Sequence, residues 1–113
     1  MRSDEILLLD MLLAAREAVG FLSGTTWETF QADRMRQLAV IKAIEVVGEA
    51  ASRVSPEFRA AHPQLPWPQI VGMRHHLVHG YFEINWQRVW QTVQEDLPAL
   101  IELLRPLVPP EEA

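Results

Sequence analysis

The residues best suited to chemistry lie together in one short run of the chain. Within eight positions it contains an arginine, three histidines and a tyrosine: Arg74, His75, His76, His79 and Tyr81. An arginine guanidinium offers a planar fork of N–H donors to phosphate, and a histidine accepts or donates a proton near neutral pH. Together they suit attack of a ribose 2′-hydroxyl on its neighbouring phosphate. His79 would handle a proton and Arg74 would neutralise the oxyanion.

A helix that ends near Gly80 is predicted to carry this run. Arg74 and Tyr81 are seven residues apart and would share a helical face if the helix reached that far. His75 and His79 are four apart and would share another face. The helix end would bring His79 and Tyr81 close to a turn, where side chains can converge.

Simpler interpretations of these residues stay open. An arginine and a histidine five residues apart are often exposed side chains with no functional role, and a tyrosine beside a glycine often anchors a helix end. His75 and His79 also have the spacing of two metal ligands. A zinc site would lack its third ligand, because the predicted helix supplies no cysteine and no nearby carboxylate.

The composition predicts a single domain over residues 1–113, with residues 108–113 as a frayed tail. With 49% hydrophobic residues the chain is typical of a globular protein. The lack of cysteine excludes a disulfide scaffold, a cysteine zinc site, a thiol nucleophile and an iron–sulfur cluster. The apolar stretch at residues 6–13 is interrupted by Asp10 and too short to span a bilayer, so a cytoplasmic protein without a membrane partner is expected.

The charge is uneven along the chain. Ten basic and fifteen acidic residues give a net charge of −5, which argues against broad electrostatic coating of nucleic acid. Residues 55–80 are the exception, because they carry two basic residues against one acidic residue and contain all four histidines. If the protein binds an anion, this segment is where binding is expected.

Apolar periodicity indicates an all-α fold, an antiparallel bundle of four main helices plus a short helix, without β-type alternation. Turn and cap residues set the expected boundaries. The expected elements are a first helix capped by Ser3 and stopped at residues 23–26, a second over about residues 27–54, a short one from Ser55-Pro56 to about His62-Pro63, a third main helix from about Trp67, and a last one capped by Asn85 and kinked at Pro98.

The second helix, over about residues 27–54, is apolar nearly all round. Its charges in the second half fall at Lys42, Glu45, Glu49 and Arg53, which form one narrow stripe. Such a helix must be covered on more than one side, so a homodimer is predicted with this helix near the interface. The pair Glu45 and Glu49 is interpreted as a solvated or dimer-bridging stripe, because basic residues flank it.

Four tryptophans could stack on nucleotide bases: Trp27, Trp67, Trp86 and Trp90. Trp86 and Trp90 lie on the apolar stripe of the last helix. We therefore expect these two to fill the core.

Several motifs, in order along nearly the whole chain, strongly resemble the HepT-like family of the HEPN superfamily. The motif Arg-x4-His-x-Tyr is intact at Arg74, His79 and Tyr81. The other matching runs are residues 27–30, 47–51, 55–57, 62–67, 73–74, 79–81 and 96–98.

The resemblance implies an all-α HEPN bundle that forms a homodimer, with the two motifs meeting in a cleft at the interface. It also implies an endoribonuclease that acts on RNA without metal or cofactor, the toxin of a type VII toxin–antitoxin pair. Arg74 and His79 would be its catalytic residues. The residue after the arginine is usually polar, often Asn or Asp; here it is His75, either a phosphate contact or a second proton carrier.

The partner that the resemblance implies is a nucleotidyltransferase antitoxin of the MntA type, which transfers AMP to the motif tyrosine, here Tyr81. AMP at this position would place a phosphate and a base where RNA must lie. Two alternatives remain. A non-catalytic module that binds nucleotide or the nucleotidyltransferase would keep Arg74 for phosphate and need no proton carrier. In a structural homodimer the histidines would have no functional role.

Overall fold

The computed structural model describes residues 3–78 and 83–109, and in them the backbone is almost entirely helical. An isolated antiparallel bridge between Val78 and Ile84 is the β-type pairing found in this part of the chain. The predicted all-α class is confirmed. In chain order the elements are α1 (Asp4–Leu22), α2 (Trp27–Ala32), α3 (Arg34–Arg53), α4 (Pro56–Ala61), α5 (Trp67–Val71), α6 (Met73–Leu77), α7 (Trp86–Gln91), the π turn η1 (Thr92–Asp96), α8 (Leu97–Leu104) and the 3₁₀ turn η2 (Arg105–Leu107).

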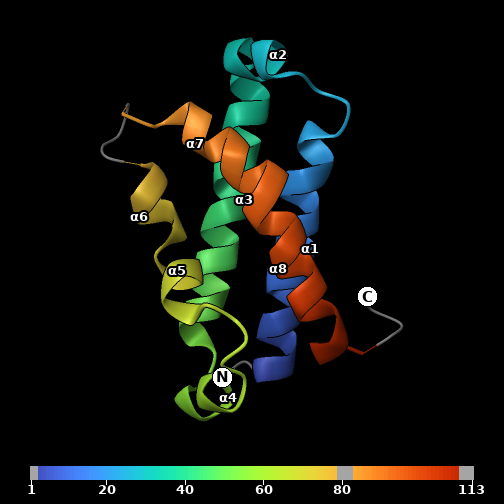
Figure 1. Cartoon of the computed structure of the whole chain (residues 1–113), viewed down its shortest axis with the longest axis vertical. Helices are drawn as coiled ribbons and strands as arrows, with labels where there is room; N and C mark the ends of the chain where they lie inside the picture. Colours follow the sequence, from blue (N-terminus) through green and yellow to red (C-terminus); the bar gives the residue numbers. More distant parts are fainter. Residues whose placement is uncertain (1–2, 79–82, 110–113) are drawn as a thin grey trace.

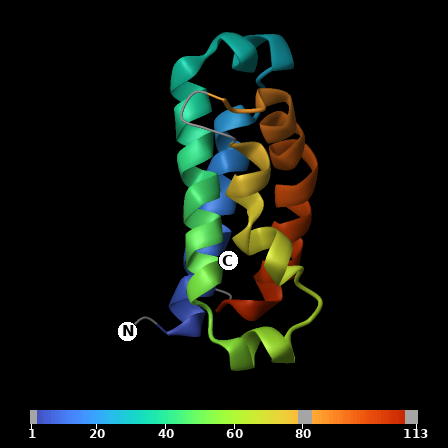
Figure 2. The ribbon, with the colours of Figure 1, turned by 90° about the vertical axis from the view of Figure 1, so that its left-hand side faces the viewer.

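The helices form a bundle around α3. Helix α1 packs along α3, and the continuous rod of α7, η1 and α8 lies across α1 (Figure 1). The pair α5–α6 lies beside α3 and runs between it and that rod (Figure 2). The bundle thus has four columns, namely α1, α3, the pair α5–α6, and α7 with η1 and α8. Together with the short helix α4 they match the predicted four main helices and one short helix.

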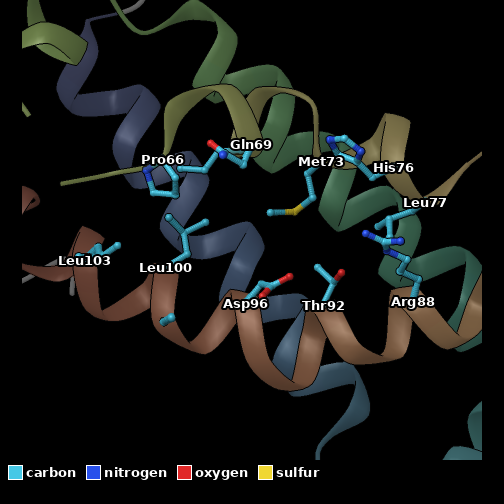
Figure 3. Close-up of a pocket in the computed structure, with 12 residues that line it drawn as sticks. Pro66, Gln69, Met73, His76, Leu77, Arg88, Thr92, Asp96, Leu100 and Leu103 are labelled. Carbon is cyan, nitrogen blue, oxygen red and sulfur yellow. The ribbon is translucent and has the colours of Figure 1, made fainter. Parts of the chain in front are cut away.

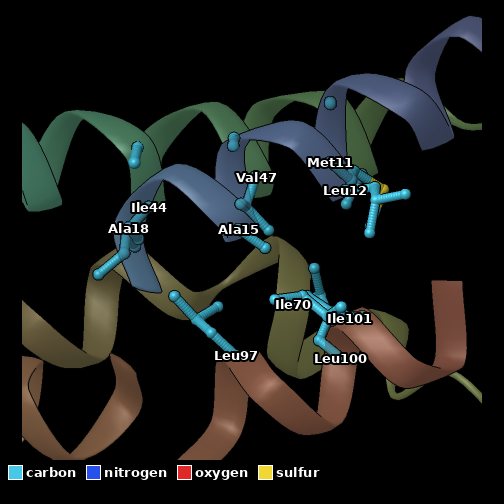
Figure 4. Close-up of a cluster of buried hydrophobic side chains, with 14 of the residues drawn as sticks. Met11, Leu12, Ala15, Ala18, Ile44, Val47, Ile70, Leu97, Leu100 and Ile101 are labelled. Carbon is cyan, nitrogen blue, oxygen red and sulfur yellow. The ribbon is translucent and has the colours of Figure 1, made fainter. Parts of the chain in front are cut away.

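The hydrophobic core lies where α1, α3, α5 and α8 meet (Figure 4). Burial of this apolar surface is the main favourable contribution to folding. Its central side chains, each at most 8% exposed, are Met11, Leu12, Ala15, Ala18, Ile44, Val47, Ile70, Leu97, Leu100 and Ile101.

An aromatic cluster joins α2 to α7. Phe30 is fully buried, and its ring centroid lies 5.6 Å from that of Trp90 and 5.9 Å from that of Trp86. Trp27 meets Trp90 edge-on at 6.1 Å. Rings at these separations stabilise a core beyond their buried area. Trp86 and Trp90 are partly buried and pack against the core, so the prediction that they fill its interior is met only in part.

The predicted single helix over residues 27–54 is wrong, because the chain breaks at Asp33. This residue leaves the helical region, with φ −107° and ψ 91°, and caps α3 by accepting a hydrogen bond from the Arg36 amide at 3.1 Å. Hydrogen bonds from the Arg36 backbone and side chain hold the pKa of Asp33 below its ordinary value. The apolar pattern continues across Asp33, so the pattern gave no sign of a break. The helix is interrupted there by the local capping bond.

The predicted helix up to Gly80 is also shorter than expected. It divides at Gly72 into α5 and α6, and α6 ends at Leu77, whose carbonyl accepts a hydrogen bond from the Asn85 amide at 2.9 Å. The next residue is extended. The condition for Arg74 and Tyr81 to share one helical face is therefore not met, and pairing with the segment before α7 is the physical reason.

The irregularity expected at Pro98 lies just before it, in the π turn η1. The Leu97 amide donates to the carbonyl of Thr92, five residues back. Pro98 then lies in the first turn of α8, where its missing N–H is not needed. The helix thus accommodates the proline by widening one turn.

The predicted caps are confirmed. The hydroxyls of Ser3 and Ser55 accept from the amides three residues on, at 3.3 and 3.1 Å, and the Asn85 carboxamide oxygen does so at 3.0 Å. Gly24, just beyond α1, has a φ of +74°, which favours glycine.

Of the predicted tail over residues 108–113, Val108 is buried against the core, and residues 110–113 lie outside the described part. No helix among the described residues has both the length and the apolarity needed to cross a membrane.

Candidate functional site

The site begins with a close contact between α3 and α5 at Gly48. A Cβ atom there would lie 3.3 Å from the carbonyl oxygen of Val71 and 3.4 Å from that of Ile70. The missing side chain lets the α5 backbone rest against α3. The start of α6 is thereby held beside the α3 turn that carries Glu45.

Across this contact the guanidinium of Arg74 meets a carboxylate of α3. Its Nε donates to Oε2 of Glu45 at 2.9 Å, and the two side chains are 46% and 33% exposed. No other residue in the described part of the chain bonds this guanidinium. The bond through Nε fixes the plane of the fork and leaves its terminal N–H groups for an anion.

Sequence reasoning missed this partnership. The spacing of charges within α3 suggested that Lys42 and Arg53 balance Glu45 and Glu49. Glu49 does pair with Arg53, at 3.0 Å, but Glu45 turns to Arg74 on another helix. No local pattern could have indicated a contact between residues 29 positions apart.

Arg74 and Glu45 lie in a groove of about 410 Å³ between α3 and α5–α6. Two basic side chains, Lys42 and Arg74, balance two acidic ones, Glu45 and Glu49, so the groove carries no net negative charge although the chain as a whole carries −5. Its lining residues are Lys42, Glu45, Gly48, Glu49, Ser52, Val71, Arg74 and His75.

The neighbouring histidines His75 and His76 line different pockets. His75 is exposed and lines the groove with Arg74. His76 lies on the opposite side of α6 and lines a second pocket, which faces α7 and α8 (Figure 3). The run that looked like one cluster in the sequence is therefore divided by the helix.

His62 has a structural role. Its ring stacks on Phe58 at a centroid distance of 3.9 Å, with Nδ1 3.0 Å from the Phe58 carbonyl oxygen. Its own carbonyl accepts a hydrogen bond from Trp67 Nε1 at 2.9 Å. These contacts close the turn after α4 and separate His62 from the candidate site.

The two remaining predicted site residues, His79 and Tyr81, lie outside the described residues. Within residues 3–78 and 83–109, no three histidine or acidic side chains come together as they would around a metal ion. The described half of the site therefore consists of Arg74, its partner Glu45, and His75.

An all-α bundle that presents Arg74 and His75 from a short helix beside its central helix is consistent with a HEPN-type domain. A family model described as Ribonuclease HepT-like matches residues 11–107. The chain belongs to this family.

Two relatives span most of the chain. A protein of Thermococcus cleftensis named "Probable ribonuclease HepT" is 36% identical over 99 residues, which cover 88% of this chain and 90% of that protein. A protein of Methanocaldococcus jannaschii named as a putative RNase is 34% identical over 99 residues, covering 88% and 91%. No solved structure was found to match the chain.

Proposed function

We propose that this protein is a metal-independent endoribonuclease, the toxin of a type VII toxin–antitoxin pair, with Arg74 and His79 as its catalytic residues. The observation that carries the proposal is the Arg74 guanidinium, held at Nε by Glu45 and open at its terminal nitrogens. The family and the names of the relatives support an RNA substrate. No cofactor is needed.

In the proposed reaction the ribose 2′-oxygen attacks the adjacent phosphorus. His79 accepts the hydroxyl proton, the 2′-oxygen bonds phosphorus, and the bond from phosphorus to the 5′-oxygen breaks. The departing oxygen takes a proton from solvent, leaving a 2′,3′-cyclic phosphate and a 5′-hydroxyl. Arg74 donates to the phosphate oxygens and stabilises the charge that builds there.

Glu45 and His75 assist Arg74 in this scheme. Glu45 is a positioning residue, because its carboxylate fixes the orientation of the guanidinium. His75 lies in the same groove, and its exposed ring is available to contact a phosphate on either side of the scissile one. The two residues confine RNA contact to a small part of an acidic protein.

Two copies of the chain would pair with α3 near the interface, so that the two motifs share one cleft. Large apolar side chains exposed on α3 support this arrangement: Met35 is 83% and Leu38 51% exposed. Large exposed apolar groups close together are typical of association surfaces.

The proposed restraint on the toxin is AMP transfer to Tyr81 by a cognate nucleotidyltransferase. Its support is the intact motif, in which Tyr81 follows Arg74 by seven residues. A bulky phosphorylated nucleotide there would compete with RNA for Arg74 by charge and by volume.

The purified protein tests the proposal with RNA in the presence of EDTA. Wild type is expected to leave 2′,3′-cyclic phosphate ends, and Arg74→Ala and His79→Ala each to lower the rate at least ~100-fold. Arg53→Ala is a control, because this exposed arginine pairs with Glu49. RNA that binds but stays intact would identify a non-catalytic module, and cleavage that zinc restores after EDTA would overturn the metal-free mechanism.

A further inference from the structure

A second pocket lies on the far side of α6 from the Arg74 groove. It has a volume of about 510 Å³ and opens between α5–α6 and the rod of α7, η1 and α8 (Figure 3). Pockets of roughly 300–1,000 Å³ commonly hold small organic ligands. The reaction proposed above uses none of its residues.

One wall of the pocket is a row of polar side chains from consecutive turns: Arg88, Thr92 and Asp96, followed by Leu100. In a regular α-helix, residues twelve apart drift about 120° around the axis. The π turn η1 adds one residue to a turn and takes up about 100° of this drift. The irregular turn therefore keeps the four side chains on one face (Figure 3).

The polar side chains of this row differ in exposure: Thr92 is nearly buried, whereas Arg88 and Asp96 are exposed at the mouth of the pocket. Thr92 is only 6% exposed, and its hydroxyl, which faces the pocket, has no hydrogen bond to any described residue (Figure 3). The side chains of Arg88 and Asp96 likewise have no ion-pair partner there. The Thr92 hydroxyl, which points into the cavity, is therefore satisfied by water or by a ligand, and the exposed groups of Arg88 and Asp96 are free to contact that ligand.

The chemistry changes along the pocket. Arg88 and His76 form a basic end, Asp96 lies near the middle, and Met73 and Leu100 supply apolar surface beside it (Figure 3). The eight residues from Arg88 to Asp96 correspond to about 12 Å along a helix. A ligand that uses the whole pocket would combine an anionic group, N–H donors some way from it, and an apolar body.

We propose that this pocket binds a guanine nucleotide. The phosphate lies at Arg88 and His76, the ribose passes Thr92, and the base packs against Met73 and Leu100. Guanine presents two adjacent N–H donors, N1 and N2, which the two oxygens of one carboxylate accept together. Asp96 is placed for this contact.

Other ligand classes fit less well. Adenine places one N–H donor beside an acceptor nitrogen, whose lone pair would face the Asp96 carboxylate. A fatty acid would leave that carboxylate against hydrocarbon, which is costly. An amino acid would fill little of a pocket of about 510 Å³. The proposal goes beyond ribonuclease activity, because it requires neither Arg74 nor His79.

Calorimetric titration of the full chain with GMP and with AMP tests the pocket. Wild type is expected to bind GMP at least tenfold more tightly than AMP, which is ~1.4 kcal/mol. Asp96→Asn removes one acceptor oxygen, so it should lower GMP affinity about tenfold and leave AMP affinity nearly unchanged. Arg88→Gln should weaken both.

Arg105→Gln is the matched control for Arg88→Gln, because Arg105 pairs with Glu102 on the surface and lies outside the pocket. It should bind both nucleotides as wild type does. Arg74→Ala should also retain GMP binding while losing RNA cleavage, which separates this proposal from the preceding one. Circular dichroism melting checks that each variant is folded.

Single-stranded RNA oligonucleotides distinguish the two sources of the ligand. If a guanosine-containing oligonucleotide displaces GMP and its adenosine analogue does not, the pocket reads a base of the RNA. If neither displaces GMP, it takes the free nucleotide. No GMP binding at millimolar concentration, equal affinity for GMP and AMP, or an Asp96→Asn variant with unchanged GMP affinity would overturn the proposal.

Discussion

Arg74 and Glu45, 29 residues apart in the chain, are joined by one bond from Nε to Oε2 of 2.9 Å. A contact through Nε leaves the two terminal nitrogens of the guanidinium free for an anion, whereas a bidentate contact with those nitrogens would occupy them. The two side chains are partly exposed, so the pair contributes little to stability and much more to orientation.

Replacement of Glu45 by glutamine tests this orientation. If Glu45 positions Arg74 for the charge of the transition state, Glu45→Gln should lower kcat about tenfold and change KM little. Glu102→Gln is the matched control and should cleave normally, because this exposed carboxylate pairs with Arg105 and does not line the Arg74 groove. If the carboxylate merely neutralised Arg74, its loss would instead tighten RNA binding and lower KM.

A side chain at Gly48 should separate α5 from α3. Gly48→Val would push on the carbonyls of Ile70 and Val71, so we expect the free energy of unfolding to fall by about 1–3 kcal/mol. Gly20→Val is the control, because Gly20 in α1 has no neighbouring atom within 4 Å of an added Cβ. Urea unfolding measures both. Equal stability of the two variants would contradict the close contact.

Two hydrogen bonds join Asp4, at the start of α1, to Ser55, which follows α3, and they should make the free energy of unfolding depend on pH. Asp4 accepts from the amide and the hydroxyl of Ser55 at 2.9 and 2.7 Å, and these bonds hold its pKa below the ordinary value. A lowered pKa in the folded state gives stability that is present above about pH 4 and is lost as the pH falls through the folded-state pKa.

Asp4→Asn should therefore unfold more easily than wild type at pH 7, by about 1 kcal/mol, and the difference should shrink towards pH 3. Urea titrations at several pH values measure it. Glu57→Gln, at an exposed carboxylate of α4, is the control. A difference that stays constant with pH would assign the effect of Asp4→Asn to something other than this charge.

Co-expression with the proposed partner, a cognate nucleotidyltransferase, should add mass to the peptide that contains Tyr81. We expect an increase of one or more AMP units, measured by mass spectrometry, and loss of RNA cleavage. Tyr81→Phe should carry no added mass and remain toxic. If the partner silences that variant equally well, binding alone restrains the toxin.

The sequence predicted much of the fold, because its signals are local. Ser3, Ser55 and Asn85 mark helix starts through bonds to amides three residues on, and each cap was read correctly. The breaks at Asp33 and Gly72 were missed, because apolar periodicity continues across both. A cap or a close backbone approach interrupts a helix without changing its hydrophobic pattern.

The sequence by itself determined the class of fold and the family, since both depend on residue type and short-range spacing, and it predicted residues 55–80 as the segment for an anion. Only the tertiary structure decided which neighbours these residues have. It placed Glu45 against Arg74 and turned His76 away from His75 into a separate pocket. The physical reason is that packing at Gly48 sets how α6 lies on α3, and that contact joins segments with no local relation in the chain.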